Sequence, residues 1–278
     1  MQVVERFVAG KAGDPLLCED AVVVTGGHAA IVDGATDITG RRYGVPGVAG
    51  GRWAMLACVE AIEALPEDAD AETATARLTA VLNERIDAGT APTARPSASV
   101  TIYSRWLRQV WQIGDVAFHY RGLPAGAGRP RKVVDRIAAD FRAAVLAAEA
   151  AAGKLDLTTG DPGRLAARAL ISRQGALRNT LGPYGFAAID GLPVPASLVV
   201  VHDVPGDVDE VVLASDGYPE IQPTLAGTEA RLAQLLAEDP HCVGVLRGTK
   251  GVMAGQISFD DRAYLRLRLP LRLPRTTT

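Results

Sequence analysis

The residues with the clearest chemical potential in this sequence are acids that lie beside short apolar runs. Asp33 ends one such run and Asp216 follows another, and each is succeeded by a glycine. The acids in comparable positions are Glu19, Asp20, Asp33, Asp115, Asp216, Asp260 and Asp261. A carboxylate placed where a strand leaves the core can meet others across the edge of a sheet, and a following glycine lets a ligand or backbone approach closely.

Several carboxylates without a regular motif are typical of sites for hard cations. Mg²⁺ and Mn²⁺ take oxygen ligands and keep several waters, which a sparse set of aspartates permits. Two such ions would lower the pKa of a bridging water and neutralise charge on a phosphoryl group, so no side-chain nucleophile is required. A single Asp-Gly pair is more often a plain turn. The joint occurrence of these acids at strand ends therefore predicts a site that hydrolyses phosphate esters.

Hydrophobic periodicity predicts the elements that position these acids. A Gly26-Gly27 pair between two β-branched runs indicates a hairpin. The expected strands are 21–25, 28–33, 98–105, 108–120, 197–203, 209–214 and 262–269, and the expected helices are 52–65, 71–88, 132–152, 163–173 and 227–238. Strands interrupted by paired helices favour a layered α+β fold. We expect one domain over residues 1–270 and a short tail over 271–278.

Composition argues against several other classes of protein. The chain has 278 residues and a formal net charge of −3, which does not favour nucleic acid as a partner. Three widely spaced cysteines indicate a reducing compartment. No apolar stretch approaches the roughly 20 residues that span a bilayer. We therefore expect a soluble cytoplasmic protein with no membrane partner.

The order of the motifs resembles the protein phosphatase 2C-like (PPM) family of metal-dependent Ser/Thr phosphatases. The similar segments are Cys18-Glu19-Asp20-Ala21, Val32-Asp33-Gly34-Ala35-Thr36, Ser97-Ala98-Ser99-Val100, Gln112-Ile113-Gly114-Asp115, Leu213-Ala214-Ser215-Asp216-Gly217 and Phe259-Asp260-Asp261-Arg262-Ala263. The resemblance implies a four-layer αββα sandwich with two antiparallel sheets flanked by helices. It also implies two Mg²⁺ or Mn²⁺ ions, with a third in some members, and a phosphoprotein or small phosphorylated molecule as substrate.

The same resemblance implies a role for each matching residue. Asp33 matches the carboxylate that bridges two metals, and Gly34 matches a backbone carbonyl ligand. Asp216 and Asp260 match ligands of the first metal. The remaining matches are Glu19 for a water-mediated contact to the second metal, Asp20 for its neighbour in that motif, and Asp115 for a third metal. Asp33 and Asp216 are thereby expected to be essential for attack by a metal-bridging water.

The chain departs from the family pattern at three positions. Ala35 and Thr36 stand where the family often has His or Met and then glycine, so the His that is a general acid in some members is absent. Ala263 stands where the family usually has Thr or Ser. The phosphate-orienting Arg before the Glu-Asp pair is also missing, and Arg41, Arg42 or Lys11 could replace it. A degenerate binding or regulatory module without turnover is therefore the alternative function.

Three further features have simpler interpretations. The glycine-rich stretch 44–51 lacks the Gly-Lys-Ser/Thr ending of a phosphate loop, so a structural role is favoured. Cys18 would be a nucleophile only after cleavage at a site that nothing in the sequence marks. A basic cluster is interpreted as a solvated loop, with recruitment of an acidic or phosphorylated partner as the alternative. Its members are Arg121, Arg129, Arg131 and Lys132.

Overall fold

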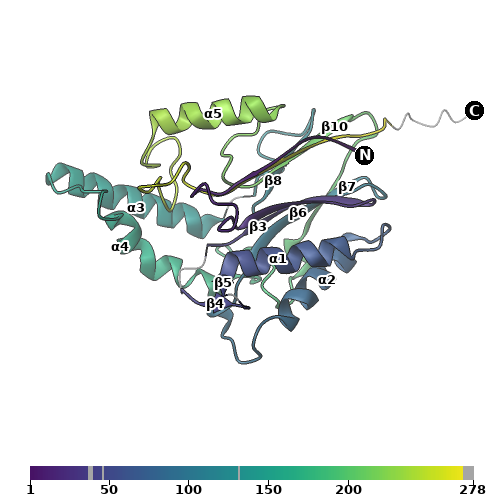
Figure 1. Cartoon of the computed structure of the whole chain (residues 1–278), viewed down its shortest axis with the longest axis horizontal. Coiled ribbons are helices and arrows are strands. Elements are labelled where there is room, and N and C mark those ends of the chain that lie inside the picture. The colour runs from purple at the N-terminus through teal and green to yellow at the C-terminus, as the bar shows by residue number, and fades with distance from the viewer. Residues whose placement is uncertain (37–39, 46, 131, 272–278) are drawn as a thin grey trace, which may run out of the picture.

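Two antiparallel β-sheets face each other in the middle of the molecule, and helices cover the outer face of each (Figure 1). The computed structural model describes residues 1–36, 40–45, 47–130 and 132–271. Within these residues, the larger sheet has the order β2 (Asp20–Val24), β3 (His28–Gly34), β6 (Ala98–Ser104), β7 (Gln109–Ile113) and β9 (Val200–Asp203). The smaller sheet has the order β1 (Gln2–Ala9), β11 (Arg262–Arg268), β10 (Glu210–Ala214) and β8 (Ala117–His119). A ribbon of β4 (Arg42–Tyr43) and β5 (Val48–Ala49) lies apart from both sheets.

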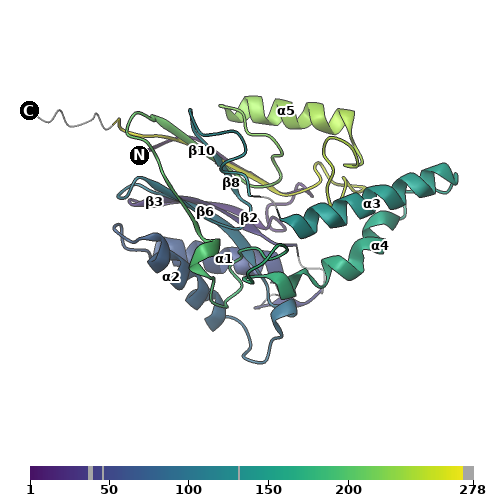
Figure 2. The same cartoon turned by 180° about the vertical axis from the view of Figure 1, so that it is seen from behind.

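The helices complete four layers. The larger sheet is covered by α1 (Gly50–Glu63) and α2 (Ala71–Glu84), and the smaller sheet by α5 (Leu225–Glu238). The remaining pair, α3 (Val133–Ala151) and α4 (Pro162–Ile171), packs together at one end of the sandwich (Figures 1 and 2). Short 3-10 helices occur at η1 (Pro92–Ala94), η2 (Gln174–Leu177) and η3 (Ala196–Leu198). These layers confirm the αββα sandwich expected from the sequence.

The alternation of β3 shows how the sequence builds two cores at once. Ala30 and Val32 pack beneath α1 and α2, whereas Ala29 and Ile31 pack in the core between the sheets. Successive side chains of a strand point to opposite faces. Asp33 therefore continues the row that points between the sheets, and it lies at the end of that row.

The observed elements differ from the expected ones in several places. The run 108–120 is two strands, β7 and β8, which belong to different sheets, because Gly114 adopts a φ of 100° between them. β1 was not expected; it is an edge strand whose side chains are only partly buried. The first part of the run 197–203 is the 3-10 helix η3.

Two further expectations concern the C-terminal tail and the lack of a membrane-spanning segment. Residues 272–278 of the expected tail lie outside the described residues. Among the described residues, no helix has both the length and the apolar character needed to cross a membrane.

Candidate functional site

The acids at the ends of β2 and β3 are neighbours by strand register. Asp20 pairs with Asp33, and Asp33 pairs with Ser99 of β6. The alternation of the strands aims these side chains into the space between the two sheets, where the apolar core ends. The larger sheet therefore presents polar side chains to the smaller sheet at this edge.

The smaller sheet brings its own acids to the same edge through β10 and β11. The Ser215 N–H donates to the Ala263 carbonyl at 3.1 Å, and the Ala263 N–H donates to the Ser215 hydroxyl at 2.8 Å. This pairing places Asp216 and Gly217 beside the segment 260–261. A Cβ on Gly217 would lie 2.0 Å from the Asp261 carbonyl oxygen, so only glycine permits this approach.

The start of α1 closes the site from the side of the larger sheet. A Cβ on Gly34 would lie 2.3 Å from the Gly51 carbonyl oxygen, and a Cβ on Gly51 would lie 2.6 Å from Glu19 Oε1. The glycines at the end of the stretch 44–51 thus allow the helix to contact the acidic edge directly, in line with the structural role expected for them.

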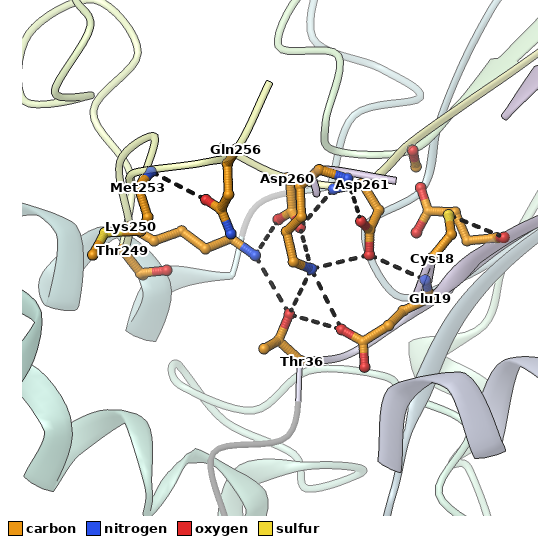
Figure 3. A network of polar contacts seen from close by, with 12 residues as sticks. Cys18, Glu19, Thr36, Thr249, Lys250, Met253, Gln256, Asp260 and Asp261 are labelled. Atoms are coloured by element: carbon orange, nitrogen blue, oxygen red, sulfur yellow. Dashed lines mark hydrogen bonds and ion pairs between the residues drawn. The ribbon is translucent and has the colours of Figure 1, made fainter. Parts of the chain in front are cut away.

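Asp261, the residue before β11, holds the N-terminal segment against the start of that strand. Its carboxylate accepts the backbone N–H of Lys11 at 2.7 Å. It also accepts the backbone N–H of Glu19 at 3.0 Å (Figure 3). The residue is only 3% exposed. The sequence grouped Asp261 with its neighbour Asp260 and did not single it out. Its partners are more than 240 positions away, so no local pattern could have indicated this contact.

Two lysine side chains enter the acidic cluster. Lys11 Nζ lies 3.0 Å from Asp261 and 3.4 Å from Asp260, and Lys250 Nζ lies 2.5 Å from Asp260. Both ammonium groups also approach the Thr36 hydroxyl, at 3.5 and 3.4 Å (Figure 3). The sequence offers Lys11 as one replacement for the missing Arg, whereas nothing in the sequence indicates Lys250.

Asp115 is held by a third lysine and a serine. Its carboxylate lies 2.8 Å from Lys132 Nζ and also accepts the Ser99 hydroxyl. Only 16% of the Lys132 side chain is exposed. The interpretation of Lys132 as part of a solvated loop was therefore wrong, and Arg131 of the same cluster lies outside the described residues.

The acids of the cluster strongly shift one another's pKa values. Burial raises the pKa of the Asp33 carboxyl well above its usual value, and the charges of Asp20, Asp115 and Asp260 add to this effect. Burial and the charge of Asp260 also raise the pKa of Asp20. Asp216 opens to solvent on one side, yet the protein atoms packed against its carboxyl and the charge of Asp33 raise its pKa well above the usual value.

Where a lysine lies close to a carboxylate, the pKa of that carboxylate is lowered instead of raised. Burial alone would raise the pKa of Asp260, but the charges of Lys250 and Lys11 outweigh it and hold the pKa below the usual value. The charge of Lys132 likewise holds the pKa of Asp115 below its usual value. The site thus contains carboxylates whose charge is balanced by a lysine and others, including Asp33 and Asp216, for which burial and mutual repulsion outweigh the effect of the lysines.

Two buried carboxylate oxygens test whether the site suits a divalent cation. Glu19 Oε1 and Asp20 Oδ2 have no hydrogen-bond partner among the described residues. A buried charged oxygen without a partner is costly, and carboxylate oxygens are the donors that Mg²⁺ and Mn²⁺ prefer. Over the described ranges, no three His, Cys, Asp or Glu side chains are already gathered as ligands of one metal ion. The donor chemistry therefore fits a cation, although the lysines hold part of the cluster.

Two cavities adjoin the acids and share Thr36. One of about 440 Å³ is lined by Lys11 and Lys250, and one of about 130 Å³ is lined by Ser99 and Lys132. Neither is lined by the two arginines expected at the substrate. Arg41 is exposed, with its guanidinium carbon 5.9 Å from the centre of the Tyr43 ring, and Arg42 is exposed in β4.

Cys18 is placed unfavourably for a nucleophile. Its side chain is buried beside Glu19, and burial raises the pKa of the thiol to about 12. A thiol of this kind stays protonated near neutral pH, and the thiolate is the nucleophilic form.

No protein-family model and no curated protein matches this sequence. Solved structures do match over nearly their full length. The serine/threonine phosphatase PstP/Ppp of Mycobacterium tuberculosis is 14% identical, with 96% of this chain and 97% of that chain covered and a TM-score of 0.48. Stp1, a serine/threonine phosphatase from Staphylococcus aureus, is 10% identical, with 97% and 96% covered and a TM-score of 0.49. RsbX, solved in complex with magnesium, is 12% identical, with 96% and 98% covered and a TM-score of 0.44.

Proposed function

We propose that this protein is a metal-dependent phosphohydrolase that acts on phosphoserine or phosphothreonine in proteins, or on a small phosphoester. The observation that carries the proposal is the acidic edge itself. Asp20, Asp33 and Asp216 have pKa values raised well above the usual range, and buried oxygens of Glu19 and Asp20 lack partners. Mutual repulsion of this kind is relieved when a cation binds.

The proposed ligands follow from the positions of the acids. Asp33 at the end of β3 is the candidate bridging ligand, and the Gly34 carbonyl lies next to it in the chain. Asp216 and Asp260 are proposed for the same centre because they are close enough for the charge of Asp260 to raise the pKa of Asp216. Glu19, Asp20 and Asp115 complete the proposed set of oxygen donors. Bound Mg²⁺ or Mn²⁺ would supply Lewis acidity and lower the pKa of a coordinated water.

The remaining polar groups are suited to holding the phosphoryl group. Lys11 and Lys250 bring positive charge to the rim of the larger cavity, and the Thr36 hydroxyl lies between them. A flexible ammonium group can move from a carboxylate to a phosphoryl oxygen with little strain. We propose Lys11, rather than Arg41 or Arg42, as the replacement for the missing Arg, because Lys11 lines the cavity.

We also propose a cellular compartment and a partner for the enzyme. All three cysteines are free and buried, which suits a reducing compartment such as the cytoplasm. A phosphorylated protein or small molecule is the proposed partner, and neither nucleic acid nor a membrane is.

One observation favours the second candidate, a binding or regulatory module without turnover. Ammonium groups of Lys11 and Lys250 already neutralise Asp260, so a cation would have to displace them. In such a module the lysines would take the place of the metal permanently.

Hydrolysis of p-nitrophenyl phosphate with and without Mn²⁺ tests the first proposal. We expect turnover that EDTA abolishes and that falls by at least about a hundredfold in Asp33→Asn and in Asp216→Asn, since each change removes a charge from the proposed ligand set. Asp203→Asn is the matched control, because Asp203 pairs with Gln109 at the opposite end of the larger sheet. Undiminished turnover in EDTA, or in both site variants, would refute the proposal.

Calorimetric titration with Mn²⁺ separates the two candidates. Binding that is lost in Asp33→Asn favours the enzyme. A folded protein that neither binds Mn²⁺ nor hydrolyses the ester would be the module.

A further inference from the structure

The larger of the two cavities that adjoin the acids extends from the acidic edge to α4. It has a volume of about 440 Å³, and its rim at the acids is formed by Lys11, Thr36 and Lys250. Its far wall is formed by α4, through Arg164 and Arg168. A ligand that enters at the acidic edge would therefore meet α4 next.

Sequence spacing and close packing aim the two arginines at the cavity. Positions four apart on a helix share a face, and Arg164 and Arg168 are so spaced. The adjacent face, one position earlier along the helix, carries Gly163 and Ala167, which are buried. A Cβ on Gly163 would lie 2.5 Å from the Arg142 carbonyl oxygen of α3. This close approach fixes the rotation of α4, and in this rotation Arg164 and Arg168 line the cavity.

Among the described residues, no ion pair neutralises the positive charge of this wall, and Asp161 and Asp260 act on Arg164 only from beyond ion-pair distance. Arg164 donates to the Thr249 carbonyl at 2.8 Å, which is a neutral acceptor. Neither Arg164 nor Arg168 forms an ion pair with a described residue. The one acid lining the cavity is Asp161, and it is already engaged, because it lies 2.7 Å from the Arg142 guanidinium and caps α4 by accepting the Arg164 N–H.

We propose that this wall binds a second anionic group of the substrate, so that the preferred substrates are phosphopeptides with an acidic group close to the phosphorylated residue. This inference rests on the proposed function, because the first phosphate is taken to bind at the acidic edge. Arg164 and Arg168 supply the positive charge. A guanidinium recognises carboxylates and phosphates in the same planar, two-pronged manner. The anionic group is therefore either an acidic side chain or a second phosphate.

Three phosphothreonine peptides test the preference for a second anionic group. One peptide has alanines on both sides of the phosphothreonine, a second has glutamates there, and a third has a neighbouring phosphoserine. We expect kcat/KM for the glutamate peptide to exceed that for the alanine peptide by about tenfold, as for a partly exposed charge-assisted hydrogen bond. The relative rates of the second and third peptides identify which anion is preferred, and a preference for either over alanine supports the proposal.

The variant Arg168→Ala tests whether the preference for acidic peptides arises at this wall. This variant should reduce the preference to about twofold without changing the rate with the alanine peptide or with p-nitrophenyl phosphate, and Arg168→Lys should restore part of it. Arg173→Ala is the matched control, because Arg173 follows the same helix but does not line the cavity. Equal loss of the preference in both variants would overturn the assignment to this wall.

Fluorescence anisotropy with the labelled peptides in EDTA keeps this inference separate from the proposed function. If p-nitrophenyl phosphate is hydrolysed but the acidic and alanine peptides react and bind alike, the inference is wrong and the phosphatase proposal stands. If no ester is hydrolysed, the phosphatase proposal fails, and tighter binding of the acidic peptides that Arg168→Ala abolishes would still establish an anion site. Equal binding of all peptides would eliminate the site.

Discussion

Single residues set the geometry of the acidic edge through close backbone contacts. Gly217 follows a proposed metal ligand, and a Cβ there would meet the Asp261 carbonyl oxygen at 2.0 Å. Gly217→Ala must push the segment 260–261 away, so we expect a loss of about 2 kcal/mol in the free energy of unfolding, as for overpacking elsewhere. Mn²⁺ affinity should fall as well. Chemical denaturation and calorimetry measure the two effects.

Gly89 offers the control for this substitution. A Cβ on Gly89 would have no heavy atom within 4 Å, so Gly89→Ala should leave both quantities nearly unchanged. Similar effects of the two substitutions would show that the close approach at Gly217 is unimportant.

Lys250 is the residue whose charge most directly opposes a cation at Asp260. Its ammonium group lies 2.5 Å from that carboxylate, and two positive charges in one site repel each other. We expect Lys250→Ala to tighten Mn²⁺ binding by at least about fivefold, because even at an effective dielectric constant of 20 a unit charge at this range contributes more than 1 kcal/mol. Calorimetric titration beside Lys154→Ala, an exposed lysine, checks this. Unchanged or weaker binding would mean that Lys250 does not compete with the cation.

At the scale of elements, one arginine connects α3, α4 and the loop that leads to Lys250. Arg142 is 1% exposed, and its guanidinium binds Asp161 and the carbonyls of His241, Cys242 and Gly248. Arg142→Leu leaves a buried carboxylate and three carbonyls without their partner. Breaking a buried pair in this way costs about 3–5 kcal/mol, which denaturation measures. Faster hydrogen exchange should be confined to these elements.

The control for Arg142→Leu is Arg247→Leu, which removes an ion pair with Asp140. Both side chains of that pair are about half exposed. Exposed pairs contribute at most about 1 kcal/mol. If the two substitutions cost the same, Arg142 does not hold the helix pair in place.

The end of α5 supplies an element whose stability depends on pH. Asp239 accepts the backbone N–H groups of Val243, Gly244 and Leu246 at 3.0, 2.7 and 2.9 Å. Burial opposes these bonds, but together they hold the pKa of Asp239 below its usual value. A depressed pKa stabilises the fold above the unfolded pKa of about 3.9, and this contribution is lost as the pH falls through the folded pKa.

Asp239→Asn should therefore destabilise the protein at pH 7 and much less at the lowest pH where both proteins are folded. Urea denaturation at a series of pH values measures the difference, with the exposed Asp68→Asn as control. A difference that is constant with pH would contradict the charge-based explanation.

Local patterns predicted most elements, but they could not supply the contacts between distant segments. The hairpin of β2 and β3 was expected because alternation and the Gly26-Gly27 turn are both local. Gly114 permits the division of 108–120 between two sheets, but the division also depends on where β10 lies, which no local pattern indicates. Likewise the strand-end acids were visible in the sequence. Lys250 and Asp261 became part of the site only through partners on the N-terminal segment and the acidic edge.

At the scale of the whole molecule, the proposed ligands come from both sheets. Asp33 ends β3 of the larger sheet, whereas Asp216 follows β10 and Asp260 precedes β11 of the smaller sheet. A cation bound to all three would tie the two halves of the sandwich together at the edge where their common core ends. Unfolding separates these ligands by nearly the length of the chain, so the cation binds the folded state alone.

Ligand binding of this kind must raise the free energy of unfolding. The increase is about 2.7 kcal/mol when the free Mn²⁺ concentration is a hundred times its dissociation constant. We expect the melting temperature to rise with Mn²⁺ by several degrees, to return to its starting value in excess EDTA, and to respond little in Asp33→Asn or Asp216→Asn. Asp203→Asn, at the far end of the larger sheet, should respond like the unaltered protein. A rise of equal size in all four proteins would place the cation elsewhere, and no rise in any would show that the acids of the two sheets do not share one.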